Sequence, residues 1–431
     1  MEMQFNSLSE RYKRPFGCVR RHEVCQLMVE VPKDCPLNRL EVVLSSDSGY
    51  GMAVSFTKEG ESEYYWEYRT EFSLPRQGLY FFHFNVELTT GSFRLFRSGE
   101  TGLRANEGEQ WQITCYPEDF QPPEDFQGAV LYQIFPDRFY REGSCDLTGK
   151  LEPYWVHDNW DDTPHYLPDE QGEILNNDFF GGNLKGIEAK LPYLKSLGVD
   201  GIYLNPVCMA FSNHRYDTAD YKRVDPMLGT EADLANLCQA AHRLGMKVIL
   251  DGVFSHTGSN SVYFDAKHLF GHGAVSDPDS PYRSWYDFQR YPEQYTSWWG
   301  IATLPCVNEL NDDYLDFIIR GEDSVLAHWL SLGIDGVRLD VADELPDEFI
   351  AVFRKRLKEL KPDAWLLGEV WEDASNKVSY GVRRKYFSAG ELDSVMNYPF
   401  RNAILSFLAG HGGDQFRRQI MTIVEHYPAA V

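Results

Sequence analysis

The stretch SLGIDGVRLD, residues 331–340, closely repeats the stretch SLGVDGIYLN at residues 196–205. In both copies, Ser-Leu-Gly is typical of a helix that closes on a left-handed glycine, and Asp-Gly is typical of a turn. The β-branched and apolar residues that follow predict a strand. A third copy, RLGMKVILD at residues 243–251, is one residue shorter. Repeated helix–glycine–strand units predict a parallel α/β fold.

The strands predicted from these repeats end on polar or acidic residues. Three of these residues are Asn205, Asp251 and Asp340, and a fourth strand, in AWLLGEVW, reaches Glu369. Because the carboxyl ends of parallel barrel strands face the active site, we expect the four side chains to converge. For any single residue the alternative is a helix cap, a position that Asp and Asn favour. Four residues in register, one of them a glutamate, favour a functional site.

The length and composition limit the number of domains, the kinds of partner and the cellular compartment that the chain can have. A chain of 431 residues is long enough for two or three domains, and 41 Lys and Arg against 65 Asp and Glu give a net charge of −24. This charge argues against nucleic acid and membranes as partners. Eight scattered cysteines without CxxC spacing and an amino-terminal stretch without an apolar run predict reduced thiols in a cytoplasmic protein, with disulfides or zinc as the alternative.

Changes in pattern along the chain predict its domains. Residues 1–116 alternate aromatic and polar residues without a helical period, which predicts a β-sandwich. Residues 117–128 form a proline-rich linker, and residues 129–431 carry the α/β pattern, with strands centred near positions 133, 203, 250, 337, 367 and 395. The aromatic segment 257–305 is too long for an ordinary connection and predicts an inserted domain over the site. Its aromatic rings either form a small core or offer flat faces to sugars.

Two acids at the ends of successive strands suit one chemistry in particular. Asp340 and Glu369 are expected to point into a common cavity, as in a retaining glycosidase, where one carboxylate attacks the anomeric carbon and the other protonates the leaving oxygen. Arg338 lies on the same side of its strand as Asp340 and is expected to keep that carboxylate ionised and aimed. A metal–carboxylate site is the competing use of such acids. It is less favoured without a DxDxDG loop or a histidine-rich ligand set.

Several motifs resemble those of the α-amylase family, glycoside hydrolase family 13. DGVFSHTG, GVRLDVADE and GEVW resemble three of its four signature regions, SNHRYDTADYKRVDP its second-strand loop, and LPCVNE a motif near the end of domain B. The N-terminal sandwich, YQIFPDRF and FFGGNLKGI are similar to the neopullulanase, cyclomaltodextrinase and maltogenic amylase branch. The resemblance implies a (β/α)8 TIM barrel with domain B after the third strand and an N-terminal β-sandwich. It also implies an intracellular enzyme that acts on maltodextrins.

The resemblance further implies roles for individual residues. Asp340 becomes the nucleophile, Glu369 the acid/base and Arg338 the orienting partner. The substrate-binding residues that it implies are Tyr216 and His256 at the sugar of the cleaved linkage, Asp251 and Asp217 as structural partners, Glu344 and Trp371 on the acceptor side, and Asn308.

The resemblance departs from the family at the sites that hold metal. Ser255 replaces the asparagine that usually precedes the histidine of the first signature region, and the usual calcium loop is reduced to Asp146 and the distant Asn183. We therefore expect no metal and no cofactor, with calcium as the less favoured alternative. The expected partners are maltodextrins and starch-derived oligosaccharides. A homodimer through the N-terminal domain is implied by the resemblance alone.

The sequence thus predicts a hydrolase of α-1,4 links in maltodextrins, with α-1,6 links as a second target. Six barrel strands can be counted, the sixth in ELDSVMNYPF, and no His-Asp pair follows Glu391. We therefore expect the last two strands and a third catalytic aspartate to be missing, and the chain as given to be inactive and poorly stable. The alternatives are a catalytically incomplete glucan-binding fragment and a transglycosylase of the same family.

Overall fold

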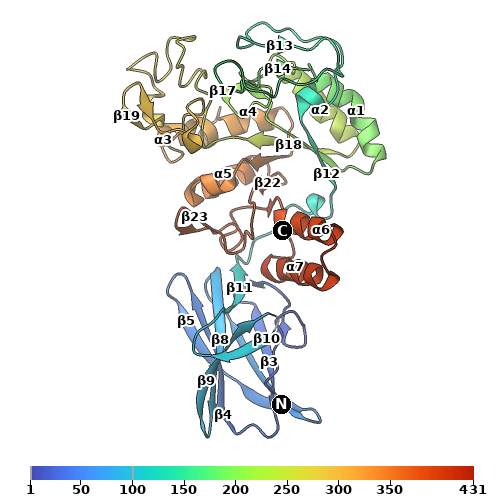
Figure 1. The fold of residues 1–431 in the computed structure, drawn as a ribbon, viewed down its shortest axis with the longest axis vertical. Coiled ribbons are helices and arrows are strands. Elements are labelled where there is room, and N and C mark those ends of the chain that lie inside the picture. Colours follow the sequence, from blue (N-terminus) through green and yellow to red (C-terminus); the bar gives the residue numbers. More distant parts are fainter. Residues whose placement is uncertain (1, 100) are drawn as a thin grey trace. The chain divides into compact units, whose positions relative to one another are not determined.

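The computed structural model describes residues 2–99 and 101–431, which divide into two compact units. One unit consists of Met1–Pro122 and Val370–Val431, and the other of Pro123–Glu369 (Figure 1). Residues after Glu369 thus group with the N-terminal residues, whereas the sequence pattern assigned them to the barrel. Among the described residues, no helix combines the length and apolar character needed to cross a membrane.

The first unit contains the predicted β-rich region as two sheets. The smaller sheet has the strand order β1-β3-β7-β6 and the larger one β10-β9-β8-β11-β2, with β4 paired to β8 and to β5. Residues from both sheets, including Val29 of β3, Phe84 of β8 and Trp111 of β11, belong to one buried core, so the two sheets form a sandwich. The strands are β1 (Lys13–Arg14), β2 (Val19–Arg20), β3 (Val24–Pro32), β4 (Leu37–Ser46), β5 (Gly51–Ser55), β6 (Thr57–Glu61), β7 (Tyr65–Ser73), β8 (Gly78–Leu88), β9 (Gly91–Ser98), β10 (Thr101–Ala105) and β11 (Trp111–Tyr116).

The carboxyl-terminal segment completes this unit. It contains the short strands β23 (Val378–Ser379), β24 (Val382–Arg383) and β25 (Ser394–Val395), and the helices α6 (Tyr398–Leu408) and α7 (Gly413–His426). The carbonyl oxygen of His426 accepts hydrogen bonds from Sγ of Cys18 at 3.1 Å and Oγ1 of Thr114 at 3.0 Å, which fixes the end of α7 to the N-terminal strands. Strand β25 lies at the sixth predicted barrel position.

A parallel sheet forms the centre of the second unit. Its strands run in the order β12-β15-β18-β21-β22, so neighbours in the chain are neighbours in the sheet. This is the order of a (β/α) barrel and not of a doubly wound sheet, in which the order reverses. The strands are β12 (Leu131–Ile134), β15 (Gly201–Leu204), β18 (Lys247–Gly252), β21 (Gly336–Leu339) and β22 (Trp365–Gly368), and the helices are α1 (Leu184–Ser196), α2 (Glu231–Arg243), α3 (Asp312–Leu315), α4 (Val325–Ser331) and α5 (Asp347–Leu360).

The repeated phrase of the sequence takes the predicted form in both copies. Gly198 follows α1 with φ +82°, and Gly333 follows α4 with φ +102°, in the left-handed region that favours glycine. Gly336 meets a second requirement, because a Cβ atom there would lie 2.4 Å from the carbonyl oxygen of Trp365 on the neighbouring strand. The glycines therefore end each helix and allow β21 to approach β22 closely.

The aspartate of each phrase fixes the start of a neighbouring strand. Oδ2 of Asp335 accepts a hydrogen bond from the backbone N–H of Val248 at 2.9 Å, and Oδ2 of Asp200 accepts one from Val130 at 3.1 Å. We call each of these pairs a strand clamp. Both clamps lie at the amino-terminal edge of the sheet. Each gives a hydrogen-bond acceptor to a backbone N–H that has no partner on the neighbouring strand.

Shorter elements lie in the connections between the barrel strands and helices. They are β13 (Trp155–Val156) paired with β14 (Asp178–Phe179), β16 (Cys208–Ala210) paired with β17 (Thr218–Val224), β19 (Phe288–Arg290) paired with β20 (Gln294–Tyr295), and single helical turns at Glu124–Phe126, Pro136–Arg138, Arg283–Trp285, Trp298–Gly300, Asp316–Arg320 and Ala342–Glu344. In the aromatic segment 257–305, Phe264 packs against Tyr286 and Tyr295 of the same segment. Tyr263 and Trp285 are buried as well, and both also contact Phe317 outside the segment.

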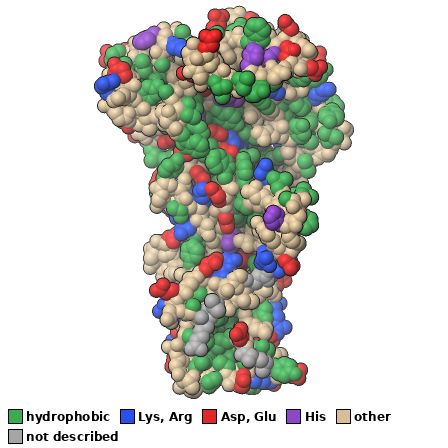
Figure 2. Space-filling model, viewed as in Figure 1, with side chains coloured by type: hydrophobic (Ala, Val, Ile, Leu, Met, Phe, Trp, Pro, Cys, Tyr) green, Lys and Arg blue, Asp and Glu red, His purple; other side chains and the backbone are tan. Residues whose placement is uncertain are grey.

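The surface and the thiols agree with the composition. Figure 2 shows Asp and Glu side chains scattered over the visible face and interspersed with Lys and Arg, so the net charge of −24 is not gathered in one patch of that face. All eight cysteines are unpaired, as the sequence predicted.

Candidate active site

Three of the four strand-end acids and amides meet around one arginine. Asp251 of β18 lies beside Arg338 of β21 in the ladder, while Asp340 and Glu369 directly follow β21 and β22. Nη1 of Arg338 donates to Oδ1 of Asp251 and to Oδ1 of Asp340, both at 2.7 Å, and Nη2 lies 2.7 Å from Oε2 of Glu369. Each of the four residues is 8% exposed or less. The predicted convergence is therefore confirmed for Asp251, Asp340 and Glu369.

This cluster holds more negative charge than one guanidinium neutralises. Burial and the carboxylates of Asp251 and Glu369 raise the pKa of Asp340 from 3.8 to about 7, although Arg338 acts in the opposite direction. Burial also raises the pKa of Asp251. With a pKa of about 7, Asp340 is about half ionised at neutral pH, and Arg338 favours the ionised form against two neighbouring carboxylates.

Two tyrosines complete the surroundings of Asp251. The hydroxyl of Tyr203 donates to Oδ2 of Asp251 at 2.5 Å, and the hydroxyl of Tyr216 donates to the same oxygen at 2.9 Å. Sequence reasoning missed Tyr203, whose only signal is a phenol within an otherwise apolar strand. Asn205, the fourth strand-end residue, instead accepts a hydrogen bond from Gln133 at 2.9 Å.

His256 lies against the loop that carries Tyr216. Its Nε2–H donates to the carbonyl oxygen of Tyr216 at 3.0 Å, because a carbonyl can only accept. Nδ1 then accepts from the hydroxyl of Ser255 at 3.1 Å. Burial lowers the pKa of His256 to about 4, so the imidazole is neutral at physiological pH. The carbonyl of Tyr216 thus fixes the tautomer of this histidine, and the Ser255 hydroxyl matches it by donating to Nδ1.

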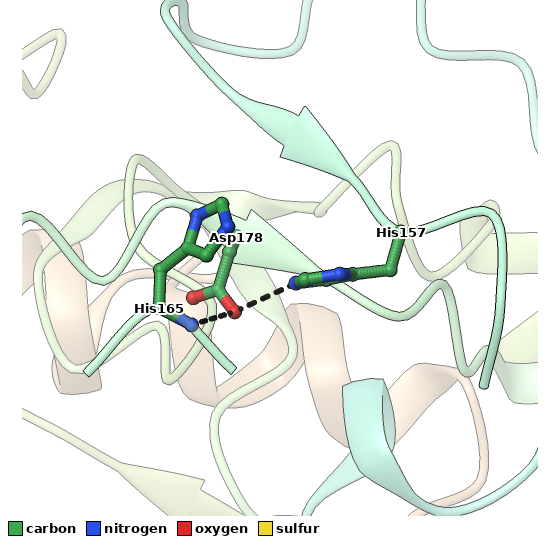
Figure 3. A group of neighbouring side chains, drawn as sticks. All are labelled: His157, His165 and Asp178. Carbon is green, nitrogen blue, oxygen red and sulfur yellow. Dashed lines mark hydrogen bonds and ion pairs between the residues drawn. The ribbon is translucent and has the colours of Figure 1, made fainter. Parts of the chain in front are cut away.

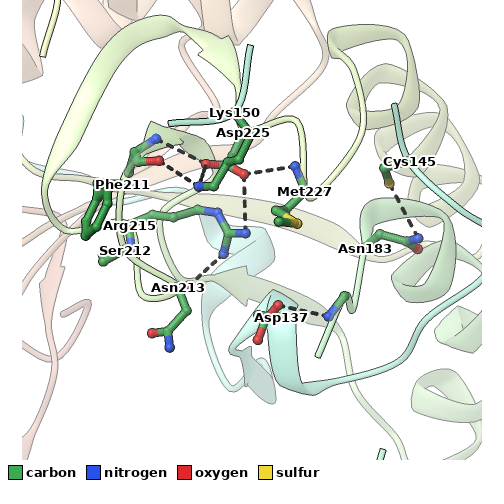
Figure 4. Close-up of polar contacts among 12 residues, drawn as sticks. Asp137, Cys145, Lys150, Asn183, Phe211, Ser212, Asn213, Arg215, Asp225 and Met227 are labelled. Carbon is green, nitrogen blue, oxygen red and sulfur yellow. Dashed lines mark hydrogen bonds and ion pairs between the residues drawn. The ribbon is translucent and has the colours of Figure 1, made fainter. Parts of the chain in front are cut away.

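A buried ion network positions the loop of Tyr216 and Asp217 (Figure 4). Nζ of Lys150 lies 2.8 Å from Oδ2 of Asp225, and Nη2 of Arg215 lies 3.5 Å from Oδ1 of the same carboxylate. All three side chains are fully buried. Asp217 accepts hydrogen bonds from the backbone N–H groups of residues 211 and 212 at 3.2 Å. The loop is therefore held by charge on one side and by backbone donors on the other.

Three further predicted residues lie around or beyond this cluster. Oε1 of Glu344 accepts a hydrogen bond from Nε1 of Trp299 at 3.0 Å. Trp299, which is 60% exposed, stacks on Trp298 with ring centroids 4.4 Å apart and an angle of 7° between the rings. Asn308 is exposed three residues after the inserted segment, and its backbone N–H donates to the carbonyl oxygen of Trp285 at 2.7 Å. Trp371 is 42% exposed and belongs to the other unit.

The residue after Asp340 adopts a strained backbone conformation. Val341 has φ +36°, in the left-handed region that a β-branched residue rarely enters. Its N–H donates to Oε2 of Glu369 at 2.9 Å. Such strain clusters at functional sites, where the surrounding structure compensates for it. The sequence carries no signal for this contact.

The residues considered for calcium do not form a site for it. Oδ1 of Asn183 accepts from the backbone of Gly186 at 2.8 Å, and its Nδ2 donates to the carbonyl oxygen of Glu142 at 3.0 Å. Asp146 is exposed and accepts from Thr148. Calcium needs six to eight oxygen ligands, and these residues are engaged separately.

Comparisons with known proteins place this geometry in a family. Residues 133–429 match the model described as "Alpha amylase, catalytic domain". "Amylopullulanase" from Thermoanaerobacter thermohydrosulfuricus is 32% identical over 481 residues, which cover 97% of this chain and 31% of that protein. "Neopullulanase 2" from Thermoactinomyces vulgaris is 34% identical over 323 residues, which cover 72% of this chain and 49% of that protein. The chain thus spans about a third of the first relative and about half of the second.

Solved structures show the same relationship. A structure titled "Cyclomaltodextrinase" has a TM-score of 0.62 and 25% identity, and the match covers 99% of this chain and 68% of that chain. "The type III pullulan hydrolase from Thermococcus kodakarensis" has a TM-score of 0.62 and 27% identity, with 99% and 70% covered. These likenesses confirm a fold of the (β/α) barrel type with an N-terminal sheet-rich region. Since the family model covers well over half of its residues, the chain belongs to the α-amylase family, glycoside hydrolase family 13.

Proposed function

We propose that this chain carries the catalytic site of a retaining α-glucan hydrolase, with Asp340 as nucleophile and Glu369 as general acid/base. The observation that supports the proposal most is the position of both carboxylates on one guanidinium, each 2.7 Å from a nitrogen of Arg338, at the ends of successive parallel strands. The names of the relatives, which include amylopullulanase and cyclomaltodextrinase, support α-glucans as the substrate class.

The reaction proceeds in two displacements. Asp340 attacks the anomeric carbon while Glu369 gives its proton to the leaving oxygen, which forms a glycosyl ester on Asp340 and breaks the glycosidic bond. Glu369 then takes a proton from water, and the water releases the sugar from Asp340. A nucleophile has to be ionised; burial and the neighbouring carboxylates raise the pKa of Asp340 to about 7, whereas Arg338 favours its ionised form.

The surrounding residues suit maltodextrin-like chains. In this proposal Tyr216 offers its ring to the sugar at the cleaved bond, and the neutral imidazole of His256 turns from the Tyr216 carbonyl to a sugar hydroxyl. The stacked Trp298 and Trp299 offer a flat aromatic face beside Glu344, on the side that accepts the leaving part of the glucan. Cleavage of α-1,4 links, with α-1,6 links as a second target, is the activity that we assign.

Covalent trapping on the 431-residue chain tests the proposal. In Glu369→Gln, the glycosyl ester should accumulate from α-maltosyl fluoride, because fluoride leaves without acid assistance and the ester lacks its general base. The intact mass should rise by one maltosyl group, and peptide mapping should place that group on Asp340. Adding Asp340→Asn should abolish the label, whereas adding Asp363→Asn, which removes an exposed carboxylate, should leave it unchanged.

Two outcomes contradict the proposal. Labelling of a different carboxylate refutes Asp340 as nucleophile. Absence of any label in Glu369→Gln, with folding verified by circular dichroism, refutes a competent site in this chain and agrees with the expectation that a third catalytic aspartate is missing.

A further inference from the structure

Two histidines and an aspartate lie together in the connection between β12 and α1 (Figure 3). His157 follows β13 and Asp178 opens β14, and the pairing of these two short strands brings the residues side by side. One ligand atom from each of His157, His165 and Asp178 lies within 4.8 Å of the other two. His157 and Asp178 are 4% and 1% exposed, whereas His165 is at the surface.

The two ring nitrogens of His157 both face carboxylate oxygens. Nε2 lies 3.1 Å from Oδ2 of Asp178, and Nδ1 lies 3.3 Å from Oδ2 of Asp162. A neutral imidazole carries one N–H, so it donates to only one of these acceptors. The other contact then sets a nitrogen lone pair against a carboxylate oxygen, which is repulsive. The geometry therefore leaves a place for a cation between Nε2 of His157 and the Asp178 carboxylate.

A metal cation accounts for every part of this arrangement. With Nδ1–H donating to Asp162, the Nε2 lone pair points at Asp178, which is the carboxylate–histidine–metal relay that orients most metal-bound histidines. Figure 3 shows both imidazole rings beside the Asp178 carboxylate, and the ring centroids of His157 and His165 lie 5.1 Å apart. His165 is exposed and free to turn its ring toward the shared position. Two imidazoles and one carboxylate, with a place left for water, form a ligand set for zinc-like ions and not for calcium.

The carboxylate is held in place by groups around it. Oδ2 of Asp178 accepts from the backbone N–H of His165 at 3.0 Å, and Oδ1 accepts from Nδ2 of Asn213 at 3.1 Å. A guanidinium nitrogen of Arg138 also lies 3.4 Å from Oδ2 and competes with a cation. Arg138 has a nearer partner in Asp137, at 2.8 Å, and keeps it when Asp178 binds a metal.

We infer that His157, His165 and Asp178 bind a divalent transition-metal ion of the zinc class, with Asp162 as the carboxylate that orients His157. The site is distinct from the cluster around Arg338 and from the residues considered for calcium. Asn213, which donates to the carbonyl and the side chain of Asp178, lies three residues before Tyr216. The bound ion therefore fixes the β12–α1 connection against the loop that carries Tyr216.

Metal titration of the chelator-stripped 431-residue chain tests this inference without any activity measurement. Calorimetry with Zn²⁺ and visible spectroscopy with Co²⁺ should both give one ion per chain, and the Co²⁺ spectrum should lack a sulfur-to-metal band because no cysteine belongs to the set. His165→Ala should weaken binding about 10-fold or more, and Asp162→Asn by about 10-fold. His272→Ala, which removes an exposed histidine elsewhere in the same unit, should leave the affinity unchanged.

The variants are chosen so that folding does not obscure the answer. His165 and Asp162 are both exposed, so their replacement should not disturb the core, and circular dichroism checks this. Zn²⁺ binding that is absent, or that is equally strong in His165→Ala and Asp162→Asn, overturns the inference. A sulfur-to-metal band overturns it as well.

Discussion

Replacing Asp340 by asparagine should stabilise the protein at neutral and alkaline pH. The change removes one of three negative charges around Arg338 and keeps an oxygen that can accept from Nη1. Folding raises the pKa of Asp340 from 3.8 to about 7, roughly 3 units, and each unit corresponds to about 1.4 kcal/mol. The ionised aspartate therefore destabilises the folded state by about 4 kcal/mol above pH 7. Because Asp251 shares the same charge cluster, we expect a measured gain of about 2–4 kcal/mol.

The sign of the pH dependence follows from where the proton binds more tightly. Between pH 3.8 and about 7 the folded state holds the proton on Asp340 better than the unfolded state does, so the stability of the parent falls as pH rises through this window. Urea unfolding followed by tryptophan fluorescence should show the advantage of Asp340→Asn at pH 8 and less than about half of it at pH 5. Asp363→Asn, at an exposed position, should show no such trend. An Asp340→Asn variant that is no more stable than the parent at pH 8, or whose advantage does not change with pH, would refute this reasoning.

Two further substitutions test packing and charge in the second unit. Gly336→Ala should destabilise the protein by about 3 kcal/mol in urea unfolding, because its Cβ would lie 2.4 Å from a backbone oxygen of β22. Gly413→Ala, with open space around it, should change stability by less than about 0.5 kcal/mol. Equal effects of the two substitutions would contradict the close approach of β21 to β22. Lys150→Met should destabilise by about 3–5 kcal/mol in the same assay, because it leaves the buried Asp225 carboxylate with Arg215, at 3.5 Å, as its remaining cation beside two backbone N–H donors, and the exposed Lys267→Met should be neutral. A neutral Lys150→Met would mean that Arg215 and the backbone donors together satisfy Asp225.

The strand-end acids could be found from the sequence because the carboxyl ends of parallel strands all lie at the same edge of the sheet. Asp251, Asp340 and Glu369 each follow or close a predicted strand, and the ladder places those ends at one edge. The pKa of Asp340 could not be found in this way, because it depends on how many carboxylates share Arg338. The strained backbone of Val341 has no signature in a local pattern either.

The second cluster was hidden for a different reason. His157, His165 and Asp178 are separated by spacings that match no metal-binding motif, so the sequence suggested no cysteine or histidine site. Strands β13 and β14, which bring them together, are two residues long each. Strands of that length have no periodicity to recognise, and only tertiary contacts define them.

In both strand clamps, the aspartate comes later in the chain than the strand that it holds. Asp200 precedes β15 and binds the start of β12, and Asp335 precedes β21 and binds the start of β18. Each aspartate is therefore synthesised after the strand that it contacts. Each strand thus gains this contact only after the aspartate, 70 or 87 residues later in the chain, has been made. A slip of one residue would turn Asp251 or Arg338 to the opposite face of the sheet. The register that aims the acids at one edge of the sheet is therefore also held by two carboxylates at the opposite edge.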